Sequence, residues 1–82
     1  MNERLIELTE INPNDLFGTQ NANIEILRKF YPKLKIVARG TSLKIYGEEE
    51  ILNEFEKRLE MLIKYFNKYN KLDENIIDQN SF

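Results

Sequence analysis

The segment 34–46 constrains the fold of this chain most, because its pattern allows a β-hairpin in one register only. Its apolar residues alternate along two short runs: Leu34, Ile36 and Ala38 on the first, Leu43 and Ile45 on the second. A two-residue turn at Gly40 and Thr41 brings all five onto one face, whereas a three-residue turn would place Arg39 against Leu43. Glycine at the first turn position also suits a type II′ geometry. The sequence therefore predicts an even register with one apolar face.

The opposite face of this hairpin is more than half basic. It carries Lys35, Val37, Arg39, Lys44 and Tyr46. A sheet with one apolar and one charged face is covered on its apolar side only. We therefore expect the helices of this protein to pack on that single side.

A strand and a short helical turn are expected before the hairpin. Residues 3–9 are rich enough in leucine and isoleucine to form a strand, and residues 12–17 suggest one short helical turn. Asn12 would cap that turn, and Pro13 would stand where a missing amide hydrogen costs little. Gly18 then interrupts the helical pattern. A second helix is expected from Thr19 or Asn21 onward.

Two amphipathic helices flank the hairpin in the sequence. The first has Ile24, Leu27 and Tyr31 on one stripe with Phe30 beside it, and Pro32 ends it. The second runs from about Glu48 to Tyr69, with an apolar stripe at steps of three and four: Leu52, Phe55, Leu59, Leu62, Phe66 and Tyr69. This second helix would be longer than the hairpin on which it packs. Its further apolar residues favour a contact beyond the fold: Ile51, Met61, Ile63 and Tyr65.

The last residues resemble the beginning of one more helix. Asp73 would cap it, and Ile76 and Ile77 would lie in its first turn. We expect the chain to end before this helix can bury anything, as in a domain taken from a longer protein. The expected division is one domain over residues 1–71, followed by a linker or helix over 72–82.

The composition excludes several classes of function. The 82 residues include no cysteine and no histidine, so disulfides, thiolate chemistry, cysteine–zinc sites and a histidine base are absent. No apolar run approaches the ~20 residues that span a membrane, and no secretory signal begins the chain, which predicts a cytoplasmic protein without a membrane partner. No catalytic residue, metal ligand or bound cofactor is expected, and an independent enzyme is the weakest of the hypotheses.

The formal net charge of −2 hides a segregation of charge along the chain. Six basic residues and no acid lie between positions 28 and 44: Arg28, Lys29, Lys33, Lys35, Arg39 and Lys44. Five glutamates follow within residues 48–56. The basic run is either an ordinary solvated surface or a patch that attracts phosphate. The glutamates at 48–50 suggest a solvated helix start rather than a metal site.

The predicted order of elements resembles a type I KH domain. That order is strand, helix, glycine loop, helix, strand, strand, helix, and Gly18-Thr19-Gln20-Asn21 occupies the place of the Gly-x-x-Gly loop. The resemblance implies an α+β fold of βααββα type, with a three-stranded antiparallel sheet and helices on one face. In KH domains this loop clamps a nucleic-acid backbone while bases lie beside the neighbouring strand. Asn21 replaces the second glycine, and asparagine tolerates the left-handed conformation that such a bend needs.

The sequence also resembles the N-terminal region of PhoH-like proteins. The resemblance lies in Leu16-Phe17-Gly18, in residues 36–40, in Leu43-Lys44-Ile45, and in Gly47 with the glutamates after it. It implies an accessory domain of a cytoplasmic, phosphate-starvation-inducible or RNA-associated ATPase. A P-loop ATPase domain, with its ATP and Mg²⁺, would follow in the same chain. The three glycines present here cannot form a P-loop, so this segment itself is expected to bind no nucleotide.

The candidate nucleic-acid-binding residues combine the loop and the hairpin: Gly18, Thr19, Gln20, Asn21, Lys35, Arg39, Lys44 and Tyr46. Lys35 and Arg39 are the candidates for phosphate contact. Tyr46 would either stack a base or simply pack on the strand. Gly18 would either open a phosphate-binding loop or merely separate two helices.

Two functions compete at this point. The first is a non-catalytic domain that binds single-stranded RNA beside an ATPase domain, with an affinity that falls as salt rises. The second is a protein-interaction module that docks on that ATPase domain or builds a homo-oligomer through the last long helix. A charge placed at Ile63 or Tyr65 would disrupt the second function, whereas glutamate at Lys35 or Arg39 would weaken the first.

Overall fold

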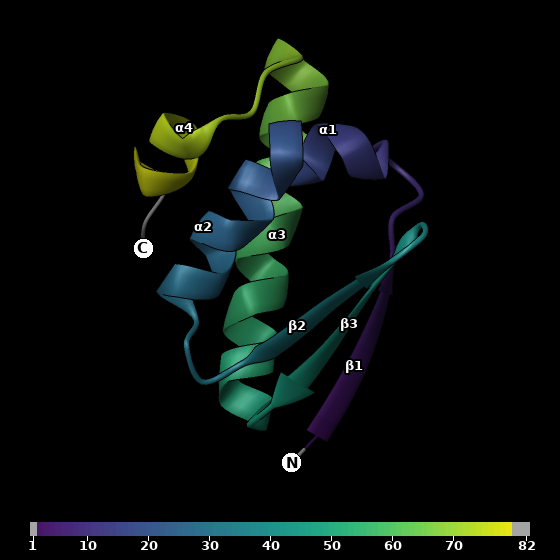
Figure 1. The fold of residues 1–82 in the computed structure, drawn as a ribbon, viewed down its shortest axis with the longest axis vertical. Helices are drawn as coiled ribbons and strands as arrows, with labels where there is room; N and C mark the ends of the chain where they lie inside the picture. The colour runs from purple at the N-terminus through teal and green to yellow at the C-terminus, as the bar shows by residue number, and fades with distance from the viewer. Residues whose placement is uncertain (1, 80–82) are drawn as a thin grey trace.

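The computed structural model describes residues 2–79, and at positions 74, 78 and 79 it describes the backbone only. Three strands form an antiparallel sheet in the order β1-β3-β2, and the helices lie on one side of it (Figure 1). The elements in chain order are β1 Asn2–Glu7, α1 Pro13–Phe17, the 3₁₀ turn η1 Thr19–Asn21, α2 Ala22–Phe30, β2 Lys35–Arg39, β3 Ser42–Gly47, α3 Glu49–Tyr69 and α4 Glu74–Gln79. The fold is therefore α+β. The order departs from the expected βααββα by η1 and by α4.

The hairpin has the predicted register. Ala38 pairs with Leu43 and Ile36 with Ile45, and Arg39–Ser42 is the last pair before the turn. Gly40 has a φ of 54°, whereas Thr41 does not have a positive φ, as in a type II′ turn. Ala38 shares this face but is exposed. The helices cover the sheet only as far as Ile36 and Leu43, so the tip of the hairpin projects past them (Figure 1).

The two short helices before the hairpin begin and end as their sequences predict. Asn12 caps α1, because its side-chain oxygen accepts from the amide of Asn14 at 2.9 Å, and Pro13 is the first helical residue. The amide of Tyr31 donates to the carbonyl of Leu27 just before Pro32, so α2 ends where proline forces it to.

Helix α3 lies at the centre of the hydrophobic core. Its buried apolar residues are Leu52, Phe55, Leu59 and Leu62, each 2% exposed or less. Two features differ from the predicted stripe: Tyr69 is 55% exposed, and Arg58 is buried. The guanidinium of Arg58 lies 5.2 Å from the ring centre of Phe30 and 5.5 Å from that of Tyr31, so it packs α3 against the end of α2. None of the helices in residues 2–79 combines the length and the apolar content that crossing a membrane requires.

The expectation that the last helix buries nothing is wrong. Ile77 is fully buried and Ile76 nearly so, and α4 packs against α2. Its predicted cap is confirmed, because the carboxylate of Asp73 accepts from the amide of Ile76 at 3.1 Å. The hydrophobic core therefore continues past the expected boundary at residue 71. Pairs of apolar residues in a short terminal helix do not by themselves reveal which groove receives them.

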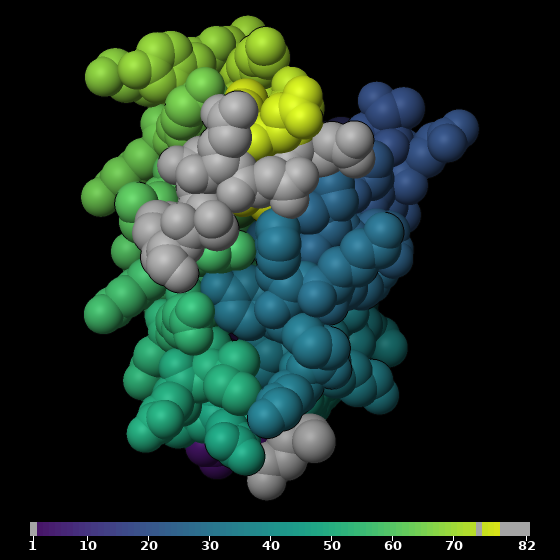
Figure 2. Space-filling view, turned by 90° about the vertical axis from the view of Figure 1, so that its left-hand side faces the viewer, coloured from purple at the N-terminus to yellow at the C-terminus, as the bar shows by residue number. Residues whose placement is uncertain are grey.

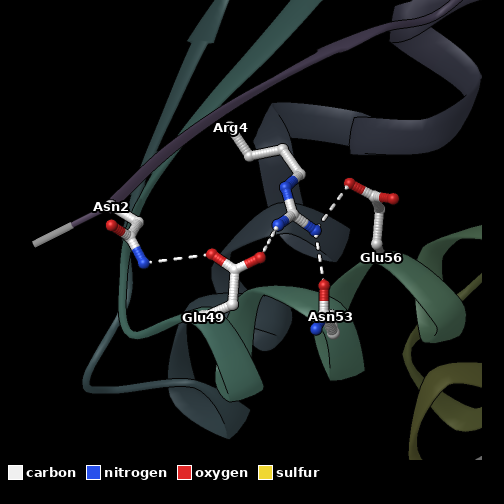
Figure 3. A network of polar contacts seen from close by, with 5 residues as sticks. All are labelled: Asn2, Arg4, Glu49, Asn53 and Glu56. Atoms are coloured by element: carbon white, nitrogen blue, oxygen red, sulfur yellow. Dashed lines mark hydrogen bonds and ion pairs between the residues drawn. The ribbon is translucent and has the colours of Figure 1, made fainter.

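A polar network ties the first strand to α3 (Figure 3). Arg4 lies on the inner face of β1, opposite Ile45, and its guanidinium reaches Glu49 and Asn53 at 2.8 Å each and Glu56 at 3.3 Å. Asn2 also donates to Glu49 at 3.0 Å. Glu49, one of the closely spaced glutamates, thus has a structural role at the start of α3.

Tyr31 is a buried tyrosine whose hydroxyl accepts or donates no hydrogen bond among the described residues. Its ring meets that of Phe55 edge to face, with 5.2 Å between centroids. Burial raises the pKa of this hydroxyl, against the opposing effect of the Arg58 cation. The folded protein therefore favours the neutral phenol.

Replacing Tyr31 by phenylalanine tests this description. Y31F removes a desolvated hydroxyl without a partner, so the free energy of unfolding at pH 7 should stay the same or rise by about 1 kcal/mol. Because the folded pKa lies above the unfolded one, the wild-type protein should lose stability as the pH rises above about 10. Y31F should lack this part of the alkaline loss. Urea unfolding at pH 7 and pH 11 measures both effects, and a loss above about 1 kcal/mol at pH 7 would contradict the description.

Candidate nucleic-acid interface

The bend between α1 and α2 has an unusual backbone over Gly18–Asn21. Gly18 has φ 80° and ψ 175°, a region that is open essentially to glycine alone. Gln20 and Asn21 then take left-handed conformations, with φ values of 55° and 61°. Thr19, Gln20 and Asn21 are all exposed. The predicted bend is therefore present as a projecting turn, and the segments around it do not form one continuous helix.

Two helix starts at this bend lack a side-chain cap. Among the side chains that the structure describes, none accepts a hydrogen bond from the first amides of η1 or of α2. The amides of Asn21 and Ala22 already bond to the carbonyls of Gly18 and Thr19. Among the described residues no backbone bond engages the amides of Thr19 and Gln20, so these two are the candidates for an anion, and the positive end of the α2 dipole lies at the same bend.

Asn23 supports the bend from beneath, and the sequence reading did not identify it. It is only 3% exposed, and its side-chain amide donates to the carbonyl of Leu72 at 3.2 Å. A methyl group built on Gly18 would lie 2.8 Å from that same nitrogen. The one available sequence signal was an asparagine four residues before Leu27 on the apolar side of the helix.

The basic residues predicted on the hairpin lie on the outer face of the sheet. The ammonium of Lys35 stands 5.8 Å from the ring centre of Tyr46, its cross-strand partner. Lys44 forms an ion pair with Glu3 of β1 at 3.2 Å. The hydrogen bond and charge of that carboxylate raise the pKa of Lys44. Strand β1 thus neutralises part of the positive charge that the hairpin alone would present.

The two halves of the predicted site do not share one face. The bend joins α1 and α2 on the helix side of the sheet, whereas Lys35, Lys44 and Tyr46 point to the side without helices. The predicted single cleft between the bend and this basic face is therefore not formed. Arg39 ends β2 beside the projecting hairpin turn and is exposed.

Helix α2 brings other basic residues to the edge of β2. Arg28 donates to the carbonyl of Ile36 at 3.0 Å and pairs with Glu25 on its own helix. It thereby joins α2 to the outer edge of β2. Figure 2 shows the face on which α2 and the segment after it lie beside α3. Lys29, Lys33, Lys35 and Arg39 form no ion pair within residues 2–79.

The arrangement on the helix side therefore comprises a bend with open amides, the exposed flank of α2, and the edge of β2. Arg28 belongs to it, although it was not chosen from the sequence. An i,i+3 partner such as Glu25 makes an arginine in the sequence look like an ordinary surface helix residue. Only the contact with Ile36 distinguishes it.

A pair of glycine substitutions tests the packing at the bend. G18A places a methyl group against Asn23 in a backbone region that only glycine adopts, and should lower the free energy of unfolding by about 2–4 kcal/mol. G40A is the matched control, because Gly40 also has a positive φ but has open space around it. It should cost about 1–2 kcal/mol. Equal losses in urea unfolding would show that the bend is not packed as described.

Replacing Asn23 tests the link between the bend and the end of the chain. N23A removes the hydrogen bond to the Leu72 carbonyl and leaves a small cavity, so it should cost about 1–3 kcal/mol. Amide hydrogen exchange should accelerate in α4 more than in the sheet, because α4 follows Leu72 directly. Unchanged exchange at Ile76 and Ile77 would disprove the coupling.

Comparison with models of protein families, with curated proteins and with solved structures yields no match for this chain. Its function has to be inferred from the residues and geometry described above.

Proposed function

We propose that this protein is a non-catalytic domain that binds single-stranded RNA along the side formed by the bend, α2 and the edge of β2. The observation that carries the proposal is the pair of uncapped helix starts at Gly18–Asn21, which lie at the head of a segment with six basic residues and no acid between positions 28 and 44. Open amides accept a phosphate, and the flanking cations hold the next ones.

The order of elements supports a KH-like version of this fold. Strand β1 precedes two helices with a glycine bend between them, and β2, β3 and α3 follow. The bend stands where the resemblance to KH domains puts the backbone-binding loop. The additions to that plan are η1, which belongs to the bend itself, and α4, which packs on α2. Neither addition interrupts the strands or the order of the helices.

The resemblance to PhoH-like proteins extends the proposal to the domain's setting. In that setting the domain would present RNA to an ATPase domain elsewhere in the same chain, and ATP and Mg²⁺ would belong to that other domain. Residues 2–79 contain no group of three acidic side chains placed to hold a metal ion.

The structure changes which basic residues are the best candidates for phosphate contact. Arg39 and Lys29 are exposed and without an ion pair among the described residues, so no internal pair competes with phosphate. Lys44 is already paired with Glu3, and Lys35 and Tyr46 face the outer side of the sheet. We therefore assign phosphate contact to the bend and Lys29, and only a peripheral role to Lys35, Lys44, Tyr46 and Arg39, which shares the outer face of β2 with Lys35.

Two acidic substitutions at the bend test the proposal. T19D/Q20D places two negative charges on exposed residues, and aspartate tolerates the left-handed conformation of Gln20. Binding of short single-stranded RNA pools at low salt should weaken at least tenfold. T9D/N53D is the matched control, since both residues are exposed and lie on the β1 side of the domain, where Thr9 lines the groove against α3 and Asn53 contacts Arg4. It adds the same charge away from the bend and should change affinity less than threefold.

Heteronuclear NMR on the same samples locates the binding. Amide shifts should concentrate in residues 18–29 and 36–39, and the affinity should fall steeply with salt because counterions are released. Shifts confined to the outer sheet residues would move the site to the other face. No shift at low salt would end the proposal for this domain.

The second function, a protein-interaction module, has its own observation. Met61 is 47% exposed and Tyr69 55% exposed, and they border one shallow hollow of α3 together with Tyr65, whose ring lies 4.6 Å from that of Tyr69. Ile51 and Ile63, which the sequence grouped with them, are half-buried against the core instead. This surface is smaller than the predicted one. A dimer that dissociates on M61D in analytical ultracentrifugation would support it over RNA binding.

A further inference from the structure

A groove runs between β1 and α3, on the opposite edge of the sheet from the proposed RNA site. Its upper part, a hollow of about 380 Å³, and its adjoining lower part share Ile6, Glu7, Glu60 and Ile63. The floor is apolar, with Ile6 and Ile63 half-buried. The network of Arg4 with Glu49, Asn53 and Glu56 lies beside its lower end (Figure 3).

The strand at this groove has one unpaired edge. β1 pairs only with β3 in the described sheet, as its first strand. The amide of Leu8 donates to Thr41 of the hairpin turn at 2.8 Å. Because the groups of an antiparallel strand alternate in direction, those of Glu3, Leu5 and Glu7 point away from β3. These three residues, which alternate along β1, therefore offer their amides and carbonyls to a further strand.

The charges around the groove select the partner. Glu7, Glu10 and Glu60 line its upper part, and Lys64 is the one basic residue beside them in that lining. A second copy of the chain is a poor occupant, because antiparallel pairing of two β1 strands centred on Leu5 would place Glu3 of one against Glu7 of the other. A basic segment would instead meet Glu7, Glu10 and Glu60, which form no ion pair among the described residues, whereas Glu3 is already paired with Lys44.

We infer that β1 accepts an extended, basic protein segment as a fourth strand, with apolar side chains alternating into the groove over Ile6 and Ile63. Residues of the segment that stand opposite Glu3, Leu5 and Glu7 share the outer face with them and are the lysines or arginines. The residues between them face α3. This interaction is separate from the proposed RNA binding and does not depend on it.

A synthetic peptide tests the inference on the 82-residue chain. The probe is acetyl-Lys-Ile-Lys-Val-Lys-Ile-Lys-amide, and a peptide of the same composition with its lysines contiguous is the control. The alternating peptide should bind at least tenfold more tightly and shift the amides of residues 3–7. Equal affinities of the two peptides would mean that net charge alone causes the binding, and would overturn the inference.

Backbone methylation separates strand addition from simple docking. In the proposed pairing the lysine amides point at β1 and the amides of the apolar residues point away. N-methylation of the two inner lysines should therefore abolish binding, whereas N-methylation of the two isoleucines should leave the affinity within threefold. Equal effects of the two modifications would disprove pairing with the edge.

Charge reversal on the protein completes the test. E7K/E60K should weaken peptide binding at least tenfold, because both glutamates line the groove. E50K/E54K makes the same change on exposed residues of α3 that do not line it and should have less than a threefold effect. Equal losses in the two double variants would contradict a specific site. Circular dichroism of each variant confirms that the fold is retained.

Discussion

The burial of one stripe of α3 organises the whole molecule. This 21-residue helix extends for about 31 Å, so its length approaches the longest dimension of the domain, 35 Å. The sheet covers mainly its first half, where Leu52 and Phe55 lie, and in the second half only β1 lies beside it, along Glu60 and Ile63 (Figure 1). That second half is covered by α1, α2 and α4, which explains why Ile77 is buried although it lies so near the end of the chain.

The bend at Gly18 follows from the same requirement. The two short helices α1 and α2 cover the part of α3 that extends past the sheet. The chain changes direction between them so that both can pack on α3. Gly18 permits the turn, and Asn23 packs against it while holding the Leu72 carbonyl. Through this hydrogen bond the bend is joined to α4. The exposed residues Thr19, Gln20 and Asn21 are thus supported by buried side chains beneath them.

The two edges of the sheet differ in charge, and this difference separates the two proposed interactions. The β2 edge adjoins Arg28 and the basic flank of α2, whereas the β1 edge adjoins Glu7 and Glu60. On the outer face, Glu3 of β1 also forms an ion pair with Lys44 of β3. A weakly negative domain therefore has a basic edge, where we propose phosphate binding, and an acidic edge, where we propose peptide binding, with the sheet between them.

Local patterns in the sequence determined the hairpin register, the Asn12 cap, the end of α2 at Pro32 and the extent of α3, because each depends on neighbours along the chain. Tertiary structure alone decided the rest. Residues far apart in sequence meet where Asn23 holds Leu72, where Arg4 holds Glu49, and where Glu3 neutralises Lys44. The sequence placed Lys44 correctly on the outer face but did not reveal Glu3 beside it, and it wrongly predicted that the helix with Ile77 would bury nothing. Both gaps have one physical reason: periodicity reports which side of an element is apolar, but not which distant element covers or neutralises it.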